Sequence, residues 1–152
     1  MENYFNPVYL KRQLQQLAPG TAPVFGKMQP QQMVEHLVMA MRLSNGKINS
    51  RLFTSAESLP KMRAFLLSDK EIQPGFRSPV AGEEPPAPVY QHIAEATEVL
   101  LSEIADFYTW FTENPESRPV HPVFGALGRQ EWVVFHTKHM KHHLKQFGLA
   151  SV

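Results

Sequence analysis

Histidine is concentrated in one short stretch of the chain, HTKHMKHH, which spans residues 136–143 and holds four of the seven histidines. On a helix with 3.6 residues per turn, side chains four positions apart share one face and lie about 6 Å apart along the axis. His139 and His143 have this spacing, so their imidazoles can bind one metal ion. His136 and His143 share a face too, but they lie about 10 Å apart and cannot bind the same ion.

A helical wheel indicates which of these histidines face the core. His136 and His143 fall within the apolar arc, and His139 lies on its edge. His142 lies well outside the arc and is expected to be solvated. Two interpretations of the buried pair stay open: a metal site, or core histidines satisfied by hydrogen bonds. The arc itself is formed by Trp132, Met140, Leu144 and Phe147.

Three further histidines lie upstream of this stretch. His36 lies on the edge of the apolar stripe of an expected helix and is the best candidate for a third ligand. His92 is expected to be a surface histidine at the start of a later helix. His121, just before Pro122, is expected either to cap backbone groups or to reach into a pocket as an auxiliary catalytic group.

The periodic apolar residues predict the elements that must position these side chains. Residues 71–88 contain five prolines and two glycines and are expected to be an extended crossover, with a lid as a second interpretation. No segment alternates convincingly as a strand. The pattern predicts an all-α four-helix bundle, in a single domain over residues 1–152, with a long Pro-rich crossover between the second and third helices. The four principal helices are expected over 7–17, 30–43, 89–112 and 129–147, and a weaker candidate covers 59–67.

The composition narrows the classes of function. With 43% hydrophobic residues, 19% charged residues and a formal net charge of +1, the chain resembles an ordinary globular protein. No dense basic run suggests nucleic-acid binding. The absence of cysteine excludes disulfides, thiolate metal sites and a cysteine nucleophile, so a metal must be held by His, Asp or Glu. Neither a signal peptide nor a membrane span is recognisable, and the cytoplasm is the expected compartment.

Two stretches resemble the signature regions of the DinB/YfiT-like superfamily, and more closely a subfamily carried as a domain of unknown function. They are FGKMQPQQMVEHL at 25–37 and HPVFGALGRQEWVVFHTKHMKHHLKQFG at 121–148. The resemblance implies a four-helix bundle, frequently dimeric, that binds a divalent metal. One ligand comes from the second helix and two from an H-x-x-x-H pair in the last. These roles fall on His36, His139 and His143.

The resemblance also implies classes of reaction. Characterised relatives include thiol-dependent transferases and an isomerase that uses low-molecular-weight thiols, and others have been labelled metal-dependent hydrolases. In the superfamily the last-helix pattern usually continues with Arg-Gly-Gln, whereas this chain has Leu144, Lys145 and Gln146. This departure weakens the transfer of any one reaction.

These observations lead to two hypotheses of different class. The first is an enzyme, a metal-dependent hydrolase or thiol-dependent transferase that uses zinc or nickel on a small molecule, with a homodimer as the expected assembly. The second is a noncatalytic helical bundle with a structural or vestigial metal site that acts through dimerisation. Acidic residues of the third helix are candidates to support the ligands, although they are also typical of a solvated helix face. They are Glu95, Glu98, Glu103 and Asp106.

Overall fold

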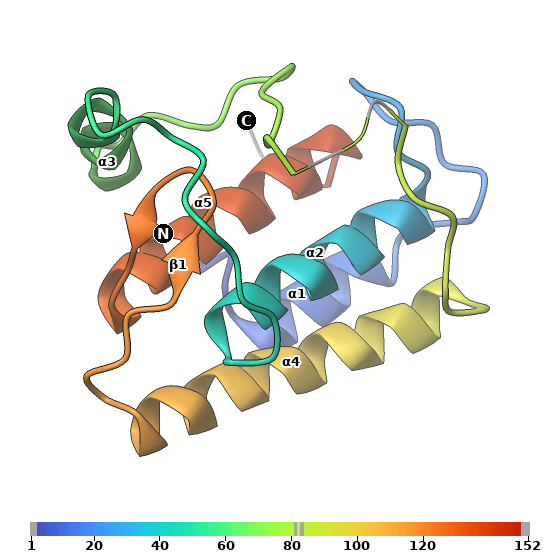
Figure 1. Cartoon of the computed structure of the whole chain (residues 1–152). Helices are drawn as coiled ribbons and strands as arrows, with labels where there is room; N and C mark the ends of the chain where they lie inside the picture. The colour runs from blue at the N-terminus through green and yellow to red at the C-terminus, as the bar shows by residue number, and fades with distance from the viewer. Residues whose placement is uncertain (1–2, 81, 83, 150–152) are drawn as a thin grey trace.

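The fold is mostly helical. A computed structural model describes residues 3–80, 82 and 84–149, which form five helices and one small hairpin (Figure 1). The expectation of a helical chain is therefore confirmed, with the addition of two short strands. The elements are α1 (Pro7–Leu14), α2 (Pro30–Ser44), α3 (Leu59–Leu67), α4 (Ile93–Glu113), β1 (Val120–His121), β2 (Gly125–Ala126) and α5 (Arg129–Gln146).

The helix ends follow from local chemistry. At the start of α1, the Asn6 side chain accepts a hydrogen bond from the backbone N–H of Tyr9, and Pro7 occupies the first turn. After α5, Gly148 adopts a φ of 70°, as expected of a left-handed C-terminal cap. The predicted bounds of α2 and α5 are confirmed to within one residue, whereas α1 ends at Leu14, three residues earlier than expected.

The start of α4 differs from the prediction for a specific reason. The helix was expected from about Val89 but begins at Ile93. The backbone N–H groups of Val89 and Tyr90 donate to the carboxylate of Glu35 in α2, at 2.7 and 3.2 Å. These hydrogen bonds to Glu35 therefore hold residues 89 and 90 outside the helix.

Four helices lie alongside one another and enclose the core. In Figure 1, the axes of α1, α2, α4 and α5 are roughly aligned, although the chain runs in opposite directions along α2 and α5. Helix α2 packs along α4, and α3 contacts α5. The predicted apolar stripes of α2, α4 and α5 are buried where these helices meet. The residues no more than 2% exposed include Met33, Val34, Leu37, Val38, Met41, Leu100, Ile104, Phe107, Phe111, Trp132, Met140 and Leu144.

The crossover between α3 and α4 is anchored at its beginning by lysines of α5. The ammonium of Lys138 donates to the carbonyl oxygen of Ser68 at 2.8 Å and to that of Lys70. Lys141 and Lys145 both form ion pairs with Glu71, and their hydrogen bonds lower the pKa of this carboxylate to about 2. The first residues of the crossover are thus fixed on α5.

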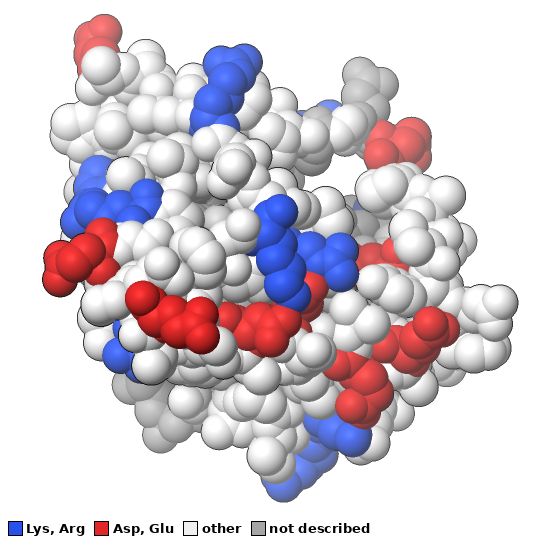
Figure 2. All heavy atoms as spheres, turned by 60° about the horizontal axis from the view of Figure 1, so that its bottom comes forward, with Lys and Arg blue, Asp and Glu red and all other residues white. Residues whose placement is uncertain are grey.

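The outward face of α4 is not uniformly solvated. Glu98 and Asp106 pair with lysines at the surface, and on the face seen in Figure 2 acidic and basic side chains are interspersed. Glu103 is only 3% exposed and binds Arg42, Lys47 and Asn45. Its expected place on the solvated face is therefore wrong, because Arg42 of α2 and Lys47 of the turn after this helix reach over it.

Among the described residues, no helix combines the length and the apolar character that crossing a bilayer requires.

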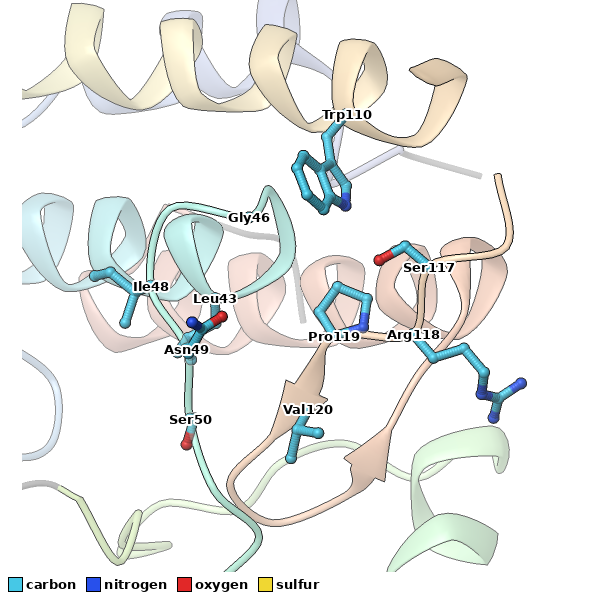
Figure 3. A pocket seen from close by; sticks show the side chains of 10 residues that line it. All are labelled: Leu43, Gly46, Ile48, Asn49, Ser50, Trp110, Ser117, Arg118, Pro119 and Val120. Carbon is cyan, nitrogen blue, oxygen red and sulfur yellow. The ribbon is translucent and has the colours of Figure 1, made fainter. Parts of the chain in front are cut away.

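The turn that follows α2 packs tightly against α4. Gly46 has a φ of 82°, and a Cβ atom at this position would lie 2.4 Å from the indole ring of Trp110. Figure 3 shows the indole above this turn, at one wall of a cavity of about 360 Å³. The other walls are Leu43 and residues 48–50 and 117–120. Gly46 is therefore required by both its backbone conformation and its close approach to the ring.

We expect Gly46→Ala to lower the free energy of unfolding by about 2–4 kcal/mol, because it adds left-handed strain to a steric clash. Gly75→Ala is the matched control, since Gly75 has a φ of 89° with no atom within 4 Å of the added Cβ. It should cost only about 1–2 kcal/mol. Urea denaturation of both variants measures the difference, and equal losses would contradict the role given to the indole.

Candidate metal centre

His36 reaches the interior from α2. It lies one turn from Met33 and one turn from Ala40, which are both buried against the core. Its own side chain is partly exposed. The helix therefore places this imidazole on the border between the core and solvent, as its position at the edge of the apolar stripe predicts.

His139 and His143 face α2 from successive turns of α5. They are 8% and 5% exposed, and their ring centroids lie 4.7 Å apart in an edge-to-face arrangement. Since α5 is continuous through both residues, the four-residue spacing places both rings on one face, as predicted.

The three imidazoles converge through the same ring nitrogen. The Nε2 atom of His139 lies 3.0 Å from Nε2 of His36 and 3.1 Å from Nε2 of His143. Two nitrogens bound at about 2.0–2.1 Å to one ion, at angles of about 90–110°, lie about 2.9–3.4 Å apart. Both distances fall in that interval. This is the one group of three or more His, Asp or Glu side chains with metal-binding geometry among the described residues.

Burial keeps the three rings neutral. It lowers the pKa of His36 to about 4, and the nearby His142 acts in the same direction. It also lowers the pKa of His139 and His143 well below 6.5, with neighbouring histidines adding to the effect. A neutral imidazole offers the lone pair that a metal ion requires. The donors are therefore in their metal-binding protonation state at pH 7.

The hydrogens at this point are difficult to arrange without a cation. A ring nitrogen carries either one hydrogen or one in-plane lone pair. Nε2 of His139 has only one hydrogen or one lone pair for both His36 and His143, so at most one of the two contacts is a full hydrogen bond. A cation would be attracted by three lone pairs at once. The donor set therefore fits a divalent ion, and three protein ligands leave one or more coordination positions open.

The rings of the candidate ligands have different neighbours. Phe135 stacks on His139 with ring centroids 5.0 Å apart, and Nδ1 of His139 has no hydrogen-bond partner in the described part of the chain. Nδ1 of His143 lies 2.8 Å from Oε1 of Gln146. The sequence indicates Gln146 only as the last residue of the pattern that follows His143. Its three-residue spacing from His143 on the same helix was the signal that could have identified it.

His121 lies outside the group of three. Its Nδ1 accepts hydrogen bonds from the backbone N–H groups of Val123 and Phe124, at 2.9 and 3.3 Å, and the ring is 6% exposed. The structure thus shows the backbone-capping alternative, in the turn between β1 and β2. Among the described residues, no contact between His121 and a candidate ligand supports the expected role as an auxiliary catalytic group.

The other histidines have distinct surroundings. His136 is fully buried, hydrogen-bonds with Oγ of Ser44 at 2.7 Å, and has its pKa lowered by burial to about 3. His92 is exposed, as expected. His142 is half-buried, with Nδ1 3.0 Å from the carbonyl oxygen of Ile72, so the expectation that it is solvated is wrong. The crossover covers this side of α5, which a helical wheel alone does not reveal.

The acids expected to support the ligands have other partners. Glu103 binds Arg42, Lys47 and Asn45, and Glu95 accepts from the backbone N–H of Gln91. The cavity beside Trp110 is separate too, since none of the three candidate ligand histidines lines it (Figure 3). Phe135 and Gln146 of α5 contact His139 and His143 instead.

Comparison with known proteins gives one match. A family model described as "Protein of unknown function (DUF1569)" matches residues 10–149, which is most of the chain. No curated protein and no protein of solved structure matches. The comparisons therefore provide no substrate or reaction, and the resemblance to DinB/YfiT-like proteins stays a prediction.

The burial of His121 predicts a pH dependence of stability. Burial lowers its pKa to about 3, against an ordinary value of 6.5. As the pH falls below about 6.5, the unfolded chain takes up a proton that the folded chain does not. The free energy of unfolding should therefore fall until the pH reaches about 3, by up to about 1.4 kcal/mol per pH unit for this group.

His121→Asn is the variant that isolates this effect, because its side-chain oxygen can still accept from Val123 and Phe124. Urea denaturation between pH 4 and 7, with a chelator present, should give a curve shallower than that of the wild type by about one proton. Parallel curves would show that His121 is not a buried neutral ring.

Proposed function

Since the chain belongs to the DUF1569 family, whose function is unknown, we propose a function from the site itself. The chain binds one divalent metal ion through His36, His139 and His143 and uses it on a small molecule. The convergence of three Nε2 atoms carries this proposal. The low pKa values of the rings support it, because they favour the neutral donors that an ion needs.

Zinc or nickel is the proposed ion. Imidazole nitrogen suits zinc, nickel, copper and iron, whereas magnesium and calcium prefer oxygen ligands. No thiolate ligand is available in a chain without cysteine. Three neutral histidines with an open position are typical of catalytic zinc sites.

The proposed reaction is hydrolysis or the transfer of a group to a low-molecular-weight thiol. When bound, the ion supplies Lewis acidity, which polarises a carbonyl group or lowers the pKa of a water or thiol. The chain itself would hold the three donor nitrogens in place and exclude solvent from the buried side of the site. Phe135 covers one face of His139, and the partly exposed His36 marks the side from which a small molecule would approach.

A noncatalytic role is the second candidate. The observation that favours it is the position of the cavity beside Trp110, which none of the three histidines lines. In that case an ion would only join α2 to α5, and the protein would act through dimerisation.

The finer features expected from the sequence belong to the same proposal. We propose that α1, α2, α4 and α5 form a DinB/YfiT-like four-helix bundle that assembles as a homodimer in the cytoplasm. The rough alignment of the axes of these helices supports the bundle (Figure 1).

Metal analysis tests the ligand assignment. Wild-type protein purified without a His tag should carry about one zinc or nickel ion per chain. His139→Ala should lose the ion and keep its helical circular dichroism spectrum, because the core of apolar residues is intact. His142→Ala is the matched control, since it removes a neighbouring imidazole of the same helix and should leave the metal content unchanged. Metal retained by His139→Ala would overturn the assignment.

Cobalt substitution separates the two candidate functions. The visible spectrum of cobalt(II) bound to the wild type should change on addition of a low-molecular-weight thiol if a coordination position is open. A catalytic centre should then also turn over in a screen of thiol-transfer and hydrolysis reactions. A spectrum that no thiol or other small ligand changes would favour the ion that only joins α2 to α5.

A further inference from the structure

Gln146 is the last residue of α5 and lies almost one turn beyond His143. Its side chain is buried, since the residue is only 4% exposed. Oε1 lies 2.8 Å from Nδ1 of His143, and Nε2 donates to the backbone carbonyl oxygen of Phe25 at 3.3 Å. The two ends of one amide group thus connect a candidate ligand to the segment that precedes α2.

The chemistry of these partners fixes the orientation of the amide. A backbone carbonyl oxygen only accepts hydrogen bonds, so the end of Gln146 that faces Phe25 must be its NH₂ group. The end that faces His143 is then the oxygen, which also only accepts. Nδ1 of His143 must therefore carry the hydrogen, because two acceptors would repel each other at 2.8 Å.

This assignment determines the state of the other ring nitrogen. A neutral imidazole with its hydrogen on Nδ1 has a lone pair on Nε2, and the hydrogen bond at one nitrogen sets which tautomer is present. Nε2 of His143 is the atom that lies 3.1 Å from Nε2 of His139. The lone pair that a metal ion needs thus points toward the common point of the three ligands.

The segment before α2 holds the amide in place. The backbone N–H of Val24 donates to the backbone carbonyl oxygen of Gln146 at 2.7 Å. Gly26 has a φ of 79°, and a Cβ atom there would lie 3.0 Å from Nε2 of Gln146. The absence of a side chain at this position allows the chain to approach the amide closely.

We propose that Gln146 is a positioning residue that holds His143 in the Nδ1–H tautomer and is itself oriented by the carbonyl group of Phe25. This inference rests on the proposed function, because the tautomer matters only if His143 binds a metal. It adds a partner for that ligand and connects residues 24–26 to the candidate centre. Partners of this kind typically change metal affinity about 10- to 100-fold.

The tautomer can be measured directly in the metal-free protein. Full-length, untagged protein labelled with ¹⁵N histidine and treated with a chelator gives long-range ¹H–¹⁵N spectra that distinguish Nδ1–H from Nε2–H. At pH 8, His143 of the wild type should carry its hydrogen on Nδ1. Gln146→Leu should shift His143 toward the Nε2–H form, whereas Gln146→Glu, which keeps an acceptor, should retain the Nδ1–H form.

Gln31→Leu is the matched control. Gln31 also lies in a helix and donates to a backbone carbonyl, that of Tyr90, but no hydrogen bond of its side chain involves a histidine. The tautomer of His143 should not change in this variant. A loss of helix stability alone would affect both Gln→Leu variants, whereas the positioning role affects only Gln146.

Zinc competition with a colorimetric chelator gives the second measurement. Gln146→Leu should bind zinc about 10- to 100-fold more weakly than the wild type and Gln31→Leu. A wild-type His143 protonated on Nε2 would overturn the inference even if Gln146→Leu fails to fold, and so would zinc affinity unchanged in Gln146→Leu. If the wild type binds no zinc although His143 has the expected tautomer, the proposed function fails, and the role of Gln146 is then limited to orienting a core histidine.

Discussion

A ring nitrogen buried in a helical core that finds a hydrogen-bond partner avoids a cost of about 1–3 kcal/mol. The inward face of α5 carries three buried histidines. Helix α2 contacts this face at two positions along its length. Ser44 hydrogen-bonds with His136, and His36 lies against His139. Since His36 and Ser44 lie eight residues apart, about 12 Å along the helix, these two contacts define how α2 lies against α5. The packing that stabilises the fold is therefore the same packing that brings the candidate ligands together.

The parts of this arrangement that depend on local periodicity could be predicted from the sequence. The apolar stripe of α2 predicted that His36 lies at the edge of the core, and the spacing of His139 and His143 predicted that they share one face. Both follow from the geometry of a single helix. That α2 and α5 face each other was inferred from the amphipathic pattern and the family resemblance together, and the structure brings the three histidines together as expected.

Two of the features that were missed depend on partners from distant parts of the chain. Glu103 has the spacing of a solvated residue, yet Arg42 and Lys47 meet it from segments about sixty residues earlier. His142 lies outside the apolar arc, yet the crossover covers it. In both cases the local pattern was interpreted correctly for an isolated helix, and the tertiary structure changed the surroundings. The hairpin of β1 and β2 was missed for a local reason, because it has only two residues in each strand, too few for alternation to be recognised.

The attachment of the crossover has a consequence for how such chains can diverge. Lys138, Lys141 and Lys145 fix its first residues on the same helix that carries His139 and His143. Insertions or deletions close to Glu71 would therefore disturb the outer side of α5. The inner side of the same helix must keep its register. Residues 73–80, which follow this attachment and are mostly exposed, can change in length at much smaller cost. Related chains should accordingly differ in length in the later part of this connection.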